Sequence, residues 1–259
     1  MQSSPHSPLS PDGDEYRLVF PKACKTRDVV SWLREGKQQF KRAPGPWVTC
    51  ILIWFVVSIL LSFIPIVGQL VSGLMNYVFI AGLMLGCHEA HKGNAFTSNY
   101  MFAGLKQNLP KLVGLGLVSM LVSGAIMWIS LGDMYPAMLS GNLESLPTDI
   151  DFNGLALSVL IASLLLIPLM MASWFAPVLI IRHDLSIYAA LRLSFVACFL
   201  NTLPFFWYGL IMLPMLLFGM FTLGLGMLIV LPVIMVSIYA SYVQIFLEPV
   251  TATTIAAQD

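Results

Sequence analysis

The sequence predicts an all-α membrane protein: a polytopic helical bundle whose six transmembrane helices form three hairpins, accompanied by interfacial amphipathic helices. Of the 259 residues, 58% are hydrophobic and 10% are charged, and the mean hydropathy is +0.84. These values lie far outside the range of soluble globular domains. The chain contains six apolar segments. Each is near the roughly 20 residues that cross about 30 Å of hydrocarbon, so each predicts one transmembrane helix.

The chain begins with a polar segment and continues with an amphipathic one. The start is rich in Ser and Pro and lacks the apolar core of a signal peptide, so we expect a flexible cytoplasmic tail over residues 1–25. In residues 26–46, Val29, Leu33 and Phe40 recur at helical spacing among five bases. This pattern predicts an amphipathic helix at the membrane interface. The alternative is a helical cap packed on the bundle.

The apolar segments make up a transmembrane domain over residues 47–248, and a short cytoplasmic tail follows over residues 249–259. The fourth segment is long enough to tilt, and Pro168 and Pro177 inside it predict a kink. The six predicted spans are Trp47–Ile64, Gly68–Cys87, Lys111–Leu131, Leu155–Ile181, Pro204–Thr222 and Leu225–Leu247.

The positions of the charged residues predict the orientation. Eight of the 13 bases precede the first span, three lie between the second and third, and two lie between the fourth and fifth. The long loop on the opposite side, residues 132–153, has no base. Its acidic residues are Asp133, Glu144, Asp149 and Asp151. The positive-inside rule therefore predicts that both termini lie in the cytoplasm. Bases and acids both number 13, so nucleic acid is not an expected partner.

The connections between spans predict an internal repeat of hairpins. Tight turns around residues 65–68 and 219–226 join the first span to the second and the fifth to the sixth. The segments that lead into the three hairpins resemble one another, as F-K-R-A-P, L-K-Q-N-L-P and F-L-N-T-L-P. Proline suits a first helical turn because its missing N–H is not needed there. Glu89, Asp184 and Glu248 follow the three even-numbered spans, which supports the repeat.

Several polar landmarks resemble those of a family of proteobacterial six-helix inner-membrane proteins of unknown function. The resemblance is carried by S-W-F-A-P-V-L-I-I-R-H-D from Ser173, A-A-L-R-L-S-F-V-A-C-F-L-N from Ala189, W-L-R-E-G-x-x-x-F from Trp32, and the first hairpin. It covers roughly residues 29–247. Membership implies an inner-membrane location and a similar fold, and it implies no reaction and no catalytic residue.

Uncharged polar side chains form two stripes at helical spacing on the second and sixth spans. They are Gln69, Ser72, Asn76, Ser237, Ser241 and Gln244. One interpretation is a path or seat for a substrate or lipid between the first and third hairpins. The alternative is interhelical hydrogen bonding at about 0.6 to 2 kcal/mol per contact. Gly82 and Gly86 form a G-x-x-x-G step that permits close packing, without identifying the partner helix.

A second candidate site is a cluster of ionisable residues at the predicted cytoplasmic face. Its members are His88, Glu89, His91, Arg182, His183 and Asp184. The run C-H-E-A-H from Cys87 could supply zinc ligands together with His183, but it lacks the H-E-x-x-H spacing of metalloproteases. The alternative is a solvated helix end, so no metal and no cofactor are expected. The four cysteines lie on or near the cytoplasmic side, where thiols stay reduced, so no disulfide is expected either.

The functional prediction follows from chemistry that the sequence lacks. No ionisable residue lies in the interior of a predicted span, and no motif of a known enzyme class is present. We therefore expect a non-enzymatic accessory component of the membrane that binds a lipid, a membrane protein partner or a second copy of itself. The alternative is a permease or flippase for a small neutral or amphipathic substrate. A third reading is a metal-dependent enzyme at the histidines.

Tryptophans near the predicted span ends suggest an aromatic belt at the two membrane interfaces. They are Trp32, Trp47, Trp128 and Trp207.

Overall fold

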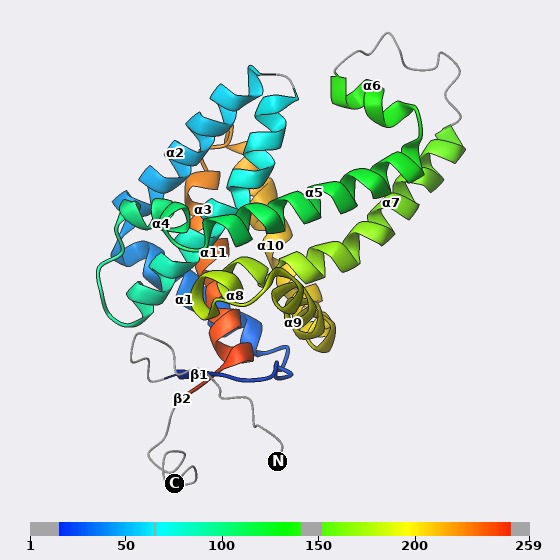
Figure 1. Cartoon of the computed structure of the whole chain (residues 1–259). Coiled ribbons are helices and arrows are strands. Elements are labelled where there is room, and N and C mark those ends of the chain that lie inside the picture. The colour runs from blue at the N-terminus through cyan, green and yellow to red at the C-terminus, as the bar shows by residue number, and fades with distance from the viewer. Residues whose placement is uncertain (1–15, 65, 141–151, 250–259) are drawn as a thin grey trace.

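The computed structural model describes residues 16–64, 66–140 and 152–249. Six helical segments in this part of the chain are long and apolar enough to cross a membrane, and the only described strands form one short ladder, which confirms the predicted fold class (Figure 1). The spans are α2 (Pro44–Ser62), α3 (Val67–His91), α5 (Leu109–Leu131), α7 (Phe152–Ser173) with α8 (Ala176–His183), α10 (Thr202–Phe221) and α11 (Met227–Phe246). The shorter elements are β1 (Tyr16–Leu18), α1 (Asp28–Arg42), η1 (Ser98–Phe102), α4 (Ala103–Lys106), α6 (Met134–Ser140), α9 (Ile187–Leu200) and β2 (Leu247–Pro249).

Consecutive spans pair as the sequence predicts, as the hairpins α2–α3, α5–α7 and α10–α11 (Figure 1). The α10–α11 turn is tight because Leu223 and Gly224 have positive φ values of 55° and 85°. The hydroxyl of Thr222 accepts a hydrogen bond from the Gly226 amide at 2.8 Å, which closes the turn. A short helical segment precedes each hairpin: α1, η1 with α4, and α9.

The fourth span breaks where a proline was predicted to bend it. α7 ends at Ser173 and α8 begins at Ala176, so Pro177 occupies the first turn of the new helix, where its missing N–H is harmless. The hydroxyl of Ser194 fills the break, because it accepts from the Phe175 amide at 2.9 Å and donates to the Met171 carbonyl at 2.8 Å. Pro168 stays inside α7.

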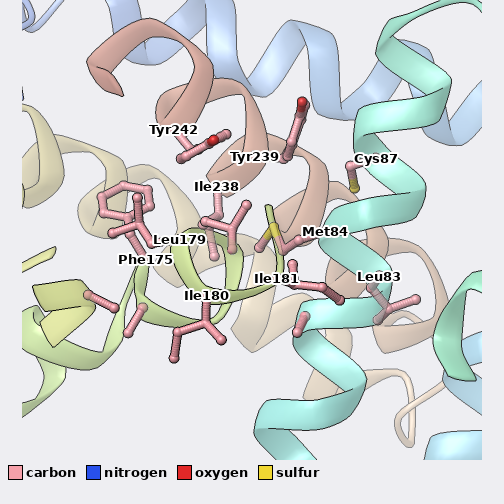
Figure 2. Close-up of a cluster of buried hydrophobic side chains, with 14 of the residues drawn as sticks. Leu83, Met84, Cys87, Phe175, Leu179, Ile180, Ile181, Ile238, Tyr239 and Tyr242 are labelled. Atoms are coloured by element: carbon pink, nitrogen blue, oxygen red, sulfur yellow. The ribbon is translucent and has the colours of Figure 1, made fainter. Parts of the chain in front are cut away.

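Helix α11 is the centre of the packing. In its most apolar window 61% of the residues are buried, against 6% in the α7–α8 span. Figure 2 shows Leu179 and Ile181 of α8 among side chains from α3 and α11, with Tyr239 and Tyr242 at the margin of the apolar cluster. The outer face of α7 exposes apolar side chains such as Leu160 and Leu164. In a membrane these side chains face lipid, so the bilayer covers them.

The structure differs from the sequence prediction at the predicted N-terminal tail, because residues 16–25 cross the end of the bundle as an ordered strap. β1 pairs antiparallel with β2, and the Lys22 amide donates to the Ile245 carbonyl at 3.0 Å. The fully buried Asn201 holds the strap further along: its Oδ1 accepts from the Cys24 amide at 2.6 Å, and its Nδ2 donates to the Lys22 carbonyl at 2.9 Å. No helical or alternating pattern in the sequence signals these contacts.

The predicted acidic loop over residues 132–153 contains the short helix α6, which lies at the far end of the α5–α7 pair (Figure 1). Glu144, Asp149 and Asp151 of that loop lie outside the described residues, as do residues 1–15 and 250–259 of the predicted tails.

Candidate functional site

The candidate site lies at the end of the bundle that carries the β1–β2 ladder, termed the polar end below. Helix α1 packs there along α11, and its buried residues are Val29, Trp32, Gly36 and Gln39. The Trp32 indole donates from Nε1 to Gln244 Oε1 at 2.6 Å, and its ring also contacts Phe205 and Tyr208 of α10. The apolar face of α1 is therefore covered by protein. This agrees with the second interpretation of the sequence, a helical cap packed on the bundle.

The opposite face of α1 carries the bases. All five are exposed: Arg27, Arg34, Lys37, Lys41 and Arg42. A helix whose apolar face is fixed to the bundle presents these charges on a rigid surface.

Two tyrosines of α11 connect the predicted histidine cluster. His88 Nδ1 lies 2.8 Å from the Tyr239 hydroxyl, and His183 Nε2 lies 2.5 Å from the Tyr242 hydroxyl. The Tyr239 and Tyr242 rings are neighbours with centroids 5.7 Å apart, and the ring of His91 also lies against Tyr239. Tyr239 and Tyr242 of α11 thus connect the ends of α3 and α8. The sequence analysis grouped the histidines of these two helix ends but did not identify the tyrosines between them.

Two carboxylates of the predicted cluster, Glu89 and Asp184, have other partners. Glu89 accepts a hydrogen bond from Asn94 at 2.7 Å, and Asp184 forms a 2.7 Å ion pair with Lys111. The hydrogen bond and charge of Lys111 lower the pKa of Asp184. Arg182 is buried at 8% exposure in the last turn of α8. The cluster therefore joins the ends of α3 and α8 to α11 and to the start of α5.

No three His, Cys, Asp or Glu side chains in the described ranges are grouped closely enough to hold a metal ion. His91, which the sequence considered as a ligand beside His88, instead places its Nδ1 3.0 Å from Glu35 Oε1 on α1. All four cysteines are free thiols.

A polar pocket lies between α1 and the end of α3, with a volume of about 270 Å³. Its lining residues are Ser31, Arg34, Glu35, Gln38, Gln39, Arg42, Ala90 and His91. Only His91 belongs to the clusters that the sequence suggested. The signal that would have found the others is their spacing, because Arg34, Gln38 and Arg42 recur every four residues along one side of α1.

The two predicted polar stripes have different surroundings. Ser237 and Ser241 are buried, and each donates to a carbonyl of its own helix, at 2.6 Å and 2.7 Å. Gln244 accepts from Trp32, as described above. On α3, Gln69 is exposed, and Ser72 and Asn76 are half-buried. The two stripes are not joined by a hydrogen bond within the described part of the chain.

Comparison with known proteins identifies the family. Over 191 residues, 70% of this chain and 70% of the relative, the sequence is 30% identical to a protein of Burkholderia thailandensis named "Probable inner membrane protein". The chain belongs to this family of inner-membrane proteins. No family model and no solved structure matches the chain. Together with the six apolar helices, the relative establishes a multi-pass protein of the inner membrane.

Proposed function

We propose that this inner-membrane protein is a non-enzymatic binding component that holds a lipid or a partner membrane protein at its cytoplasmic face. The observation that carries the proposal is α1, whose apolar side is fixed on α11 while its five bases face outward. A rigid row of bases at the level of the lipid head groups attracts anionic lipid or an acidic partner surface. An enzyme or carrier does not require that arrangement.

The distribution of charge supports a cytoplasmic location for the polar end. The described bases lie in the strap, in α1, in the connection from α3 to the first turn of α5, and from the last turn of α8 to α9, whereas Asp133 beside α6 belongs to a loop without any. The positive-inside rule then directs both termini to the cytoplasm.

The polar contacts inside the bundle support binding more than passage of a substrate. Ser237 and Ser241 lie beneath α1 with their hydroxyls bonded to their own helix, and Gln244 is engaged by Trp32. The bond from Trp32 to Gln244 joins α1 to α11, as interhelical hydrogen bonds in membrane proteins do, and the two serines place no hydroxyl toward another stripe. The alternative of a permease or flippase would have to draw on Gln69, Ser72 and Asn76 alone.

Native mass spectrometry of the protein, released gently from its own membrane, tests the proposal. A retained anionic lipid or a retained protein subunit is the expected result. A retained neutral solute would favour the permease instead, and a bare monomer under conditions that preserve known lipid complexes would contradict the proposal.

A further inference from the structure

We propose that the pocket between α1 and the end of α3 is a phosphate-binding site, for the phosphate of an anionic lipid head group or for a soluble phosphate ester. The inference rests on the proposed binding function and assigns a ligand class and residues to it. A volume of about 270 Å³ is at the small end for ligand pockets, which suits one compact anionic group.

The charge of the pocket favours an anion. Arg34 and Arg42 line it, both are exposed, and neither forms an ion pair with any described carboxylate. The one acidic side chain among the lining residues, Glu35, contacts His91 at 3.0 Å and the Gln39 amide at 3.4 Å. The Glu35 carboxylate thus interacts with His91 and Gln39. The guanidinium groups of Arg34 and Arg42 remain available to a ligand in the pocket.

The types of donor in the pocket match phosphate oxygens. A guanidinium is a planar fork that binds phosphate through two parallel N–H bonds, and Arg34 and Arg42 lie two helical turns apart on the same side of α1. Gln38 between them adds an amide donor. Gln39 is 5% exposed, and its Oε1 has no hydrogen-bond partner in the described part of the chain. Its Nε2 already donates to Glu35 Oε1 at 3.4 Å, so Gln39 is not counted among the donors of the site.

The position of the pocket makes a lipid phosphate accessible. Arg42 lies two residues before Pro44, the first residue of span α2, and His91 is the last residue of span α3. The pocket therefore lies where two spans leave the apolar layer, which is the level of head-group phosphates.

The test compares two double variants of the full-length protein in nonionic detergent. Arg34→Gln with Arg42→Gln removes the proposed ligands, whereas Lys106→Gln with Arg192→Gln removes the same charge from exposed positions outside α1 and outside the pocket. The probes are phosphatidylglycerol, titrated by native mass spectrometry, and inorganic phosphate, followed by the shift in Tm. We expect binding at least about tenfold weaker for the arginine pair and within about twofold of wild type for the control pair.

The two probes distinguish the sources of the phosphate. Arginine-dependent binding of phosphatidylglycerol that excess inorganic phosphate does not displace indicates a lipid ligand. An increase in Tm caused by inorganic phosphate in wild type, and absent in the arginine pair, indicates a soluble one. Equal losses in the two double variants, or no binding of either probe, would overturn the inference.

Two further controls keep the result interpretable. Arg34→Lys with Arg42→Lys keeps the charge and loses the fork, so its affinity should lie between those of wild type and the glutamine variant. A ligand that stays on the arginine pair as firmly as on wild type would refute this site and leave the proposed binding function intact. A wild-type protein that retains nothing would refute both.

Discussion

Gly36 of α1 lies directly against Ser237 of α11. A Cβ atom added at Gly36 would stand 2.5 Å from Ser237 Oγ and 2.6 Å from the Val233 carbonyl oxygen, closer than real Cβ contacts permit. The absence of a side chain therefore allows α1 to approach the most buried span. Because the bases of α1 depend on this contact for their fixed position, the packing of one glycine links the fold to the proposed site.

Substitution at Gly36 should loosen α1. Gly36→Ala inserts a methyl group into a space already filled by Ser237 and Val233, so we expect a loss of about 1 to 3 kcal/mol in the free energy of unfolding. Gly45→Ala is the matched control, because nothing lies within 4 Å of the added atom. Thermal unfolding in detergent measures both, and equal Tm values for the two variants would contradict the packing of α1 on α11.

Substitution by Leu should lower the stability of the protein at Gln244 of one predicted polar stripe but not at Gln69 of the other. Gln244→Leu leaves the Trp32 N–H without an acceptor in a buried place, which should cost about 1 to 3 kcal/mol. Gln69 and Gln244 are both exposed, but the Gln69 side chain has no hydrogen-bond partner among the described residues, so Gln69→Leu should leave the Tm nearly unchanged. If Gln69→Leu is the more destabilising, the role assigned to Gln244 is wrong.

Asn201 should hold the N-terminal strap. Asn201→Ala removes the acceptor of the Cys24 amide and the donor to the Lys22 carbonyl, so hydrogen exchange over residues 16–25 should accelerate. Thr202→Ala is the control, because its hydroxyl bonds only to carbonyls of the preceding helix. Unchanged exchange in Asn201→Ala would show that the strap is held by other contacts.

The strap should also weaken in acid. The hydrogen bond and charge of Lys22 lower the pKa of Glu248 from 4.5, so this ion pair stabilises the fold above that pH and is lost as the pH falls through the lowered value. Protection factors for the amides of Val19 and Lys22 should therefore stay constant at higher pH and fall as the pH drops below the ordinary pKa of 4.5. In Glu248→Gln protection should already be lower at the higher pH, and the acid-induced change should be smaller. An identical pH response in that variant would exclude the Glu248 pair as its cause.

The features that the sequence predicts correctly are those that depend on local residues. The six spans follow from apolar length, the break before Pro177 follows from a missing N–H, and the α10–α11 turn follows from glycines. A lipid-embedded helix satisfies its backbone within one segment, so its position needs no knowledge of its neighbours.

The features that the sequence does not predict depend on residues far apart in the chain. Gly82 and Gly86 suggest a packing step, but the structure packs them against the segment from Phe96 to Met101 and not against another span. Trp32 and Trp47 are buried at 2% and 0% exposure, unlike members of an aromatic belt. The Trp32 indole donates to Gln244 and the Trp47 ring stacks on Phe96, and only the fold brings these partners together.

The claim on which both functional proposals depend is that the polar end faces the cytoplasm. Single cysteines at Lys37 and Asp133, in a protein whose four native cysteines are changed to Ser, test it by reaction with a membrane-impermeant maleimide in intact spheroplasts. Both positions are exposed, and they lie at opposite ends of the predicted topology. The account predicts labelling at Asp133→Cys in intact spheroplasts, and labelling at Lys37→Cys only after the membrane is opened. Labelling of Lys37→Cys in sealed cells would contradict it.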